Sequence, residues 1–211
     1  MALSNSLTIC SLTVFILLVV AHFLPANADI RVVNNCTFSL TVFYQSQNVD
    51  PANFSLPSNG TQQLNLTSEW LDGMIWASQN ANPNKSQATK LDFAIGGFFN
   101  QDYYDLSLVR AYNLAAKILP TFLANGDQAN GLHCGSPTCS IPDVNSVCRG
   151  RNHFEGPDHA CINTDGPGGN STEYTTLFQA PCPGVATYSS EPETVYACSS
   201  GSQYDVIFCP I

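Results

Sequence analysis

The chain has 211 residues, of which 11% are charged, and its 7 Lys and Arg against 16 Asp and Glu give a net charge of −9. Nucleic acids and anionic membranes both attract basic surfaces, so this composition argues against either as a partner. The 44% of hydrophobic residues argue against intrinsic disorder. The length suits one folded domain with a core of its own.

Residues 1–28 have the features of a secretory signal peptide. Residues 11–20 are mostly apolar, and Ala26-Asn27-Ala28 is the small-residue pattern that precedes a cleavage site. The apolar run is short for a membrane-spanning helix. The first ten residues contain no Lys or Arg, so a retained anchor stays open as the alternative. We expect cleavage after Ala28, export of the protein, and one mature domain over residues 29–211.

Eight cysteines remain after the signal peptide: Cys36, Cys134, Cys139, Cys148, Cys161, Cys182, Cys198 and Cys209. An even number in an exported chain predicts four disulfides rather than a metal site, although about 105 pairings are possible. His133, His153 and His159 lie near these cysteines, but no Cys-x-x-Cys or His-x-x-x-His pair accompanies them. We therefore expect no metal and no cofactor, and we place these histidines in surface loops.

Asn-x-Ser/Thr acceptors for N-linked glycans occur at Asn53, Asn59, Asn65, Asn84 and Asn170. A sixth acceptor at Asn35 is the weakest, because Cys36, which we expect to form a disulfide, occupies its middle position. Their density fits an extracellular surface.

Alternation of apolar and polar residues predicts short strands in the N-terminal half of the mature chain. Residues 38–44 place Phe38, Leu40, Val42 and Tyr44 on one face, and residues 61–67 place Leu64 beside Leu66. Further strands are expected at 74–78, 91–95, 103–109 and 204–209. Because Pro, Asn and Gly cluster between these segments, the pattern favours an antiparallel sandwich or barrel.

Residues 124–170 are rich in Gly, Pro, Asn and Cys and show no periodicity, so disulfides must hold this region. One short helix is expected after it. Asn170 with Glu173 three residues later resembles a capping box, and the helix would run to Gln179, before Pro181.

Several segments together resemble the thaumatin-like proteins, over essentially all of residues 30–210. They are residues 30–36, 73–77, 91–95, 102–109, 112–114, Cys182-Pro183 with Tyr188, and 203–210. The resemblance implies a mainly β, thaumatin-like antiparallel sandwich with a disulfide-stapled loop region and at most one short helix. Large members have sixteen cysteines, so eight indicate a small-type member. The family order implies the pairs Cys36–Cys209, Cys134–Cys198, Cys139–Cys182 and Cys148–Cys161.

The resemblance also implies an acidic cleft between the sandwich and the cysteine-rich loops. Asp92, Asp102 and Asp105 match three of its five positions, whereas Met74 replaces an Arg and Gly184 replaces an Asp. Tyr103 and Tyr104 are candidate sugar-stacking rings, like Phe98 and Phe99, although strand alternation should turn two of these four aromatic residues inward. A glycan on Asn84 would lie near this cleft.

Glycoside hydrolysis needs two carboxyl groups, about 5–5.5 Å apart for retention, one of them with a raised pKa. Asp92 with Asp102 or Asp105 would supply such a pair. Asp in place of Glu shortens the reach by one methylene, and loss of the Arg removes a fixed hydrogen-bond donor. The alternative is structural, with Asp105 bonding a strand end and Asp102 solvated.

The resemblance implies a monomeric, antifungal, pathogenesis-related defence protein secreted to the apoplast. We expect it to bind fungal cell-wall β-1,3-glucan or a microbial protein without catalysis. One alternative is a weak endo-β-1,3-glucanase that uses Asp92 with Asp102 or Asp105. Another is an inhibitor of microbial glycosidases such as xylanases, as some small members are.

Overall fold

The computed structural model describes residues 29–64, 66 and 70–211. The predicted signal peptide and the acceptor Asn65 lie outside the described residues and stay predictions. Within the described ranges, no helix is long and apolar enough to cross a membrane.

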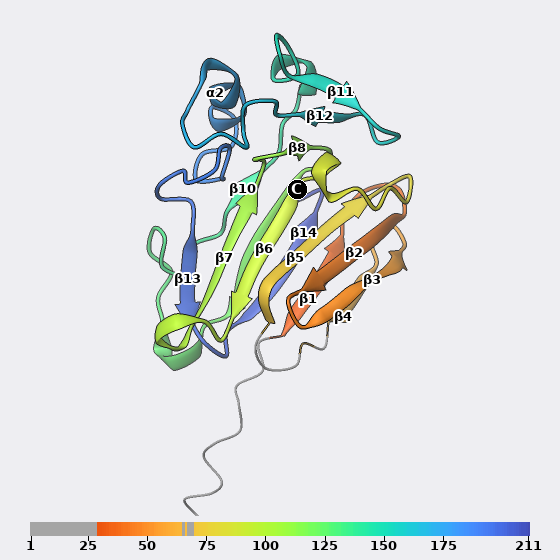
Figure 1. Cartoon of the computed structure of the whole chain (residues 1–211). Coiled ribbons are helices and arrows are strands. Elements are labelled where there is room, and N and C mark those ends of the chain that lie inside the picture. The colour runs from red at the N-terminus through yellow and green to blue at the C-terminus, as the bar shows by residue number, and fades with distance from the viewer. Residues whose placement is uncertain (1–28, 65, 67–69) are drawn as a thin grey trace, which may run out of the picture.

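The larger of two packed sheets has six strands, each antiparallel to its neighbours (Figure 1). In spatial order they are β13 (Tyr196–Ser199), β7 (Gln101–Ser107), β6 (Lys90–Ile95), β5 (Trp70–Ser78), β2 (Leu40–Ser46) and β3 (Val49–Leu56). Four of the predicted strand segments lie largely within β2, β5, β6 and β7. Phe38 lies before β2 but still packs against the core.

The second sheet has five strands and brings the two ends of the domain together. In spatial order they are β10 (Thr138–Cys139), β9 (Ala116–Phe122), β14 (Gln203–Phe208), β1 (Ile30–Asn34) and β4 (Thr61–Leu64). β1 and β14 pair in parallel, so the expected antiparallel arrangement holds except at this pair. Cys36 and Cys209 follow these two strands and form a disulfide, which fixes the chain ends side by side.

The core lies between the two sheets and is built by alternation along their strands. In β6, Leu91, Phe93 and Ile95 are buried between half-buried outward-facing residues. The Phe93 ring lies 5.7 Å from the ring of Tyr204 on the opposite sheet, and Tyr104 lies 5.2 Å from Tyr204. Burial of such aromatic rings is a main source of stability in a sandwich.

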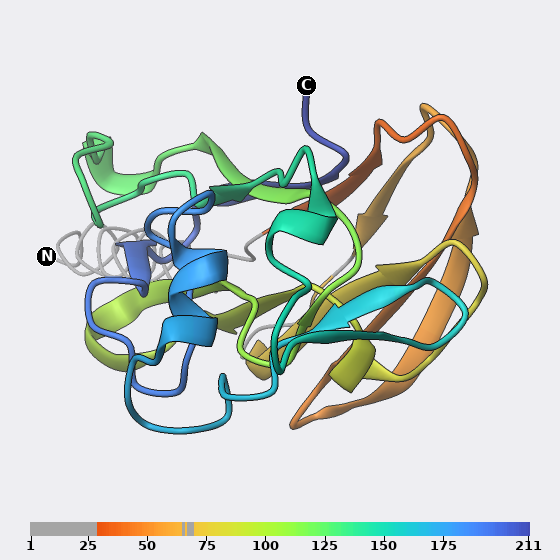
Figure 2. The ribbon, with the colours of Figure 1, turned by 90° about the horizontal axis from the view of Figure 1, so that it is seen from above.

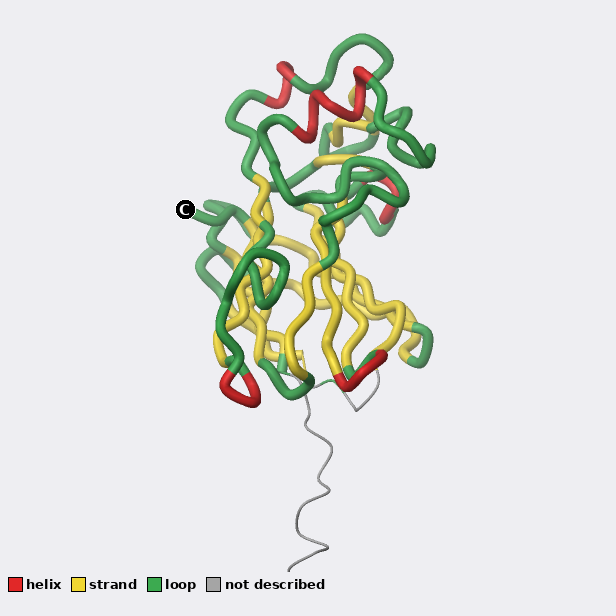
Figure 3. The backbone as a smooth tube through the Cα atoms, turned by 90° about the vertical axis from the view of Figure 1, so that its left-hand side faces the viewer, coloured by secondary structure: helices red, strands yellow, loops and turns green. Residues whose placement is uncertain are grey.

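A loop-rich region covers one end of the sandwich. Figure 3 shows it in green at the upper end of the strands, which are yellow. It contains a small sheet of β11 (His153–Glu155), β12 (Ala160–Ile162) and β8 (Ala111–Tyr112), and the helix α2 (Glu173–Gln179). From above, α2 and the β11–β12 hairpin lie on opposite sides of this end (Figure 2). Four 3₁₀ turns complete the described elements: Lys85–Gln87, Phe98–Asn100, Ala124–Gly126 and Val144–Ser146.

Disulfides hold this loop region, as its composition indicates. Besides Cys36–Cys209, the structure has Cys134–Cys198, Cys139–Cys182 and Cys148–Cys161, the pairs that the resemblance implies. Each of these three attaches a loop to a strand, since Cys139 lies in β10, Cys198 in β13 and Cys161 in β12.

The helix α2 ends at the predicted Gln179, but its start differs from the prediction. The N-cap is Thr172, whose Oγ1 accepts hydrogen bonds from the backbone N–H groups of Tyr174 and Thr175. The Thr172 N–H in turn donates to Thr175 Oγ1 at 2.9 Å. The predicted capping box of Asn170 and Glu173 was wrong. The capping pair is Thr172 and Thr175, which have the same spacing of three residues and lie two positions further along the chain.

Replacement of Thr172 by Ala should lower the free energy of unfolding by about 1 kcal/mol, because two N–H groups of the first turn lose their acceptor. Urea denaturation followed by circular dichroism measures this. Thr172 also completes the acceptor sequence of Asn170, so Asn170→Gln is the control for loss of a glycan. Thr172→Ser retains both features, and a loss as large as that of Thr172→Ala would contradict the capping role.

Candidate functional site

The candidate site lies on the outer face of the six-stranded sheet, away from the core. Met74, Asp92 and Asp105 occupy adjacent positions on β5, β6 and β7, since Met74 pairs with Asp92 and Asp92 pairs with Asp105. Residues directly opposite each other in an antiparallel pair have Cβ atoms only about 4.5–5.5 Å apart. The fold therefore holds two carboxyl groups side by side with an apolar residue next to them.

These residues line a pocket of about 260 Å³. Tyr103 borders it on β7, and Val195, just before β13, closes one side. The floor is thus part of a rigid sheet, which fixes the positions of both carboxyl groups.

Proximity and burial change the protonation of the pair. Burial, together with the charge of Asp92, raises the pKa of Asp105 to about 8. Burial also raises the pKa of Asp92, although the nearby Lys90 ammonium offsets part of this. Because burial and the charge of Asp92 raise the pKa of Asp105, Asp105 is the member of the pair that keeps its proton more readily near neutral pH.

Asp92 has one paired and one free oxygen. Lys90 Nζ lies 3.5 Å from Asp92 Oδ2. Asp92 Oδ1 is buried and finds no hydrogen-bond partner among the described residues. Buried polar atoms are normally hydrogen-bonded, so this oxygen is an acceptor whose capacity the described residues leave unused.

The structure corrects the prediction that Asp102 belongs to this cleft. Asp102 is fully buried on the opposite face of β7, because residues three apart in a strand point to opposite sides. Its carboxylate accepts a hydrogen bond from the Gly96 N–H at 2.8 Å and one from the Tyr204 hydroxyl at 3.2 Å. Asp102 is neither solvated nor in the pocket, and it fixes the β6–β7 turn to the core.

Only one of the two candidate tyrosines offers its side chain to the site. Tyr103 is half-buried on the outer face, and its hydroxyl donates to the carbonyl of Phe98 at 3.2 Å. Tyr104 is 1% exposed, and its ring stacks on Tyr196 within the core. Alternation along β7 accounts for this difference.

Gly184 and Asn84, which were also expected at or near the cleft, do not line this pocket. Gly184 has a φ of +74°, and a Cβ there would lie 2.5 Å from the Tyr196 hydroxyl oxygen, so the backbone favours glycine at this position. Asn84 does not border the carboxylate pocket and lies instead beside two other surface hollows.

Sequence reasoning missed Lys90 and Val195. Lys90 could have been found, because residues 90 and 92 share one face of a strand. Val195 could not, because it enters through the pairing of β13 with β7, which joins segments nearly a hundred residues apart.

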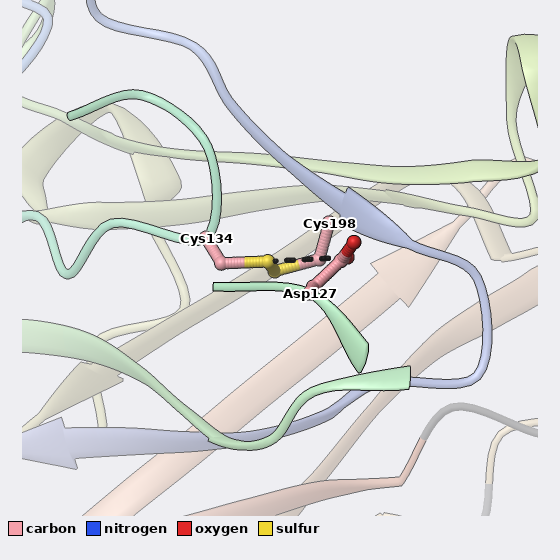
Figure 4. A group of neighbouring side chains, drawn as sticks. All are labelled: Asp127, Cys134 and Cys198. Carbon is pink, nitrogen blue, oxygen red and sulfur yellow. Dashed lines mark hydrogen bonds between the residues drawn. A yellow bond between two sulfur atoms is a disulfide. The ribbon is translucent and has the colours of Figure 1, made fainter. Parts of the chain in front are cut away.

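A second group, of Asp127 with the disulfide cysteines Cys134 and Cys198, lies at the β13 edge of the sheet (Figure 4). Asp127 Oδ2 lies 3.5 Å from Cys134 Sγ and accepts a hydrogen bond from the Ser199 N–H at 2.7 Å. Both sulfurs of Cys134 and Cys198 are already bonded to each other, so neither is a thiolate that would bind a metal. The carboxylate here anchors β13.

Comparison with known proteins identifies relatives of this chain. A family model described as the Thaumatin family matches residues 80–210. The pathogenesis-related 5 protein Jun a 3.0101 of Juniperus ashei is 30% identical over 122 residues, which cover 53% of this chain and 50% of the relative. The chain thus spans about half the length of the curated pathogenesis-related proteins that it matches first.

Two other similar proteins are named for inhibition. A Zea mays protein named alpha-amylase/trypsin inhibitor is 23% identical over 225 aligned residues, which cover 87% of this chain and 100% of the relative. The solved structure of the thaumatin-like xylanase inhibitor TLXI has a TM-score of 0.47 and 10% identity, and the match covers 86% of this chain and 99% of that one.

Proposed function

Because this chain belongs to the thaumatin family, we propose that it is a secreted defence protein that binds microbial cell-wall β-1,3-glucan without cleaving it. The observation that carries this proposal is the Asp92–Asp105 pair in its pocket on the sheet. Ligand sites combine an apolar wall with a few fixed polar groups, and this pocket has that composition.

The pair offers both kinds of hydrogen bond that a sugar hydroxyl needs. The protonated carboxyl of Asp105 donates, and the carboxylate of Asp92, whose side chain is 27% exposed, accepts. Tyr103 and Met74 supply apolar surface for the C–H face of the ring. At about 260 Å³ the pocket is smaller than most enclosed ligand sites, so it takes part of a polysaccharide chain rather than a whole oligosaccharide.

Binding is favoured over hydrolysis by what flanks the pair. A glycosidase positions its substrate with further polar donors, but here the neighbour of Asp92 on β5 is Met74. Asp102, the other carboxylate expected to take part, is in the core. The raised pKa of Asp105 is nevertheless a property of a general acid, so weak hydrolysis is the first alternative and must be measured.

Inhibition of a microbial glycosidase is the second candidate, and an exposed turn supports it. Phe98 and Phe99, between β6 and β7, are 84% and 92% exposed. Aromatic residues on a protruding turn are typical anchors of protein interfaces. The maize relative named as an inhibitor aligns along its whole length with this chain.

The test uses the oxidised mature protein, the Asp92→Ala, Asp105→Ala variant and, as a control, Asp50→Ala on the exposed part of β3. Sedimentation with insoluble β-1,3-glucan should show about thirtyfold weaker binding of the double variant, because two hydrogen-bonding groups worth about 1 kcal/mol each are lost. The Asp50→Ala variant should bind like the wild type.

If the wild type releases reducing ends and the double variant does not, the protein is a hydrolase and the proposal of binding without cleavage is wrong. No glucan retention, together with slowing of an added xylanase, would instead favour the inhibitor.

A further inference from the structure

A second hollow on the outer face of the six-stranded sheet has no part in the carboxylate site. It has a volume of about 440 Å³, and two stacked aromatic rings lie at its floor. The ring centroids of Phe43 and Trp76 are 5.5 Å apart and their planes differ by 13°. We call this hollow the aromatic groove.

The rim of the aromatic groove is polar and contains two of the predicted glycan acceptors, Asn53 and Asn84. Asn53 lies on β3 directly opposite Phe43, and Phe43 lies directly opposite Trp76. Directly opposite residues share a face of the sheet, with Cβ atoms about 4.5–5.5 Å apart. The side chain of Asn53 therefore starts beside the Phe43 ring.

The sequence around Asn53 is accessible to modification. Asn53 and Ser55, the first and third residues of the acceptor sequence, are both exposed on the edge strand β3. Phe54 between them turns to the other face and packs against the core. A sugar joined to Asn53 thus begins at the groove and not at the core.

We propose that the aromatic groove is the seat of this protein's own N-linked glycan, attached to Asn53, whose first N-acetylglucosamine packs on Phe43 and Trp76. In the attachment step, Asn53 Nδ2 forms a bond to C1 of the sugar and loses one proton. The bond from C1 to the pyrophosphate of a lipid-linked oligosaccharide donor breaks, and the lipid pyrophosphate leaves with the electron pair.

Asn53 is a better placed origin than Asn84, the other acceptor on the rim. Asn84 lies on a loop before a 3₁₀ turn, where its Oδ1 accepts the Ser86 N–H at 3.1 Å. No strand pairing holds it beside either ring. The position of Asn53 is instead fixed by the register of β3 with β2.

The glycan has a structural consequence at this edge of the sheet. β3 is the outermost strand, so its outer backbone groups are open to pairing with another chain. A glycan seated at Asn53 shields this edge and covers the small part of the groove floor that is still exposed, since Phe43 and Trp76 are 8% and 3% exposed.

The test uses the full chain secreted from a host that performs N-glycosylation. Mass spectrometry of glycopeptides should find Asn53 occupied. Peptide N-glycanase acting on the native protein should release this glycan at least tenfold more slowly than the glycan of Asn170, which lies outside the groove. After denaturation the two rates should be equal.

Variants then test whether the aromatic rings of the groove are what slows release of the Asn53 glycan. Phe43→Leu should raise the native release rate at Asn53 towards that at Asn170, while release at Asn170 stays unchanged. Ser55→Ala, which keeps Asn53 but removes the acceptor sequence, should lower the midpoint of thermal unfolding, whereas Asn170→Gln should not.

An unoccupied Asn53, release at Asn53 as fast as at Asn170, or protection of Asn84 alone would each overturn the proposal. If Phe43→Leu does not fold, the comparison of the two sites in the wild type still decides it. Neither result bears on glucan binding by the Asp92–Asp105 pair, so the two proposals fail independently.

Discussion

Removal of the Cys36–Cys209 disulfide, in the variant Cys36→Ser, Cys209→Ser, should lower the free energy of unfolding by about 3–5 kcal/mol. The bond joins residues 173 positions apart, so it closes a loop that contains almost the whole domain. A disulfide stabilises mainly by restricting the unfolded chain, and the restriction grows with the loop. Guanidinium denaturation under oxidising conditions measures the loss.

The matched control is Cys148→Ser, Cys161→Ser, which opens a loop of only 13 positions in the loop-rich region. Its loss should be smaller, by about 2 kcal/mol, because loop-closure entropy increases with the logarithm of loop length. Both variants leave no free thiol from the removed bond. Equal losses, or a loss below about 1 kcal/mol for the longer loop, would argue that the adjacent strands β1 and β14 hold the ends together without the bond.

Strand alternation predicted much of the sandwich from the sequence. Leu40 and Val42 are buried as expected, and Tyr44 packs against the same core. Phe43 was outside this pattern, yet it is only 8% exposed because it lies under the groove on the outer face. A pattern with a period of two finds the buried face of a sheet but not a second, covered face.

The candidate site was predicted in part, for a reason that lies in β7. Asp102 and Asp105 both matched the family pattern, but an odd separation places them on opposite faces of the strand. Alternation alone would therefore have removed Asp102 from the site. The pairing of Asp92 with Asp105 was less accessible, because it depends on the register of β6 with β7, which is set by the length and shape of the turn between them.

The parallel pair of β1 and β14 also could not be read from the pattern. Alternation predicts a strand but carries no information about its neighbour or its direction. The resemblance linked Cys36 to Cys209, and this link brings the strands before them together.

A rise in pH from 4 to 8 should lower the free energy of unfolding of the wild type relative to that of Asp105→Asn by about 3 kcal/mol, because ionisation of Asp105 is less favourable in the folded protein than in the unfolded chain. The folded protein holds the pKa of Asp105 at about 8, above its ordinary value of 3.8. Well below pH 3.8 the carboxyl is protonated in both states. Between these values the unfolded chain releases the proton and the folded chain keeps it, so stability falls as pH rises towards 8.

An amide at position 105 has the size of the protonated carboxyl but does not ionise, so the variant lacks this dependence. Urea denaturation at pH 4, 6 and 8 should give the smallest difference in stability at pH 4 and a growing advantage of the variant above it. Asp50→Asn, an exposed change of the same charge on β3, should follow the wild type at every pH. A constant difference between wild type and Asp105→Asn across this range would mean that Asp105 is ionised in the fold, and its proposed role as a hydrogen-bond donor to glucan would fail with it.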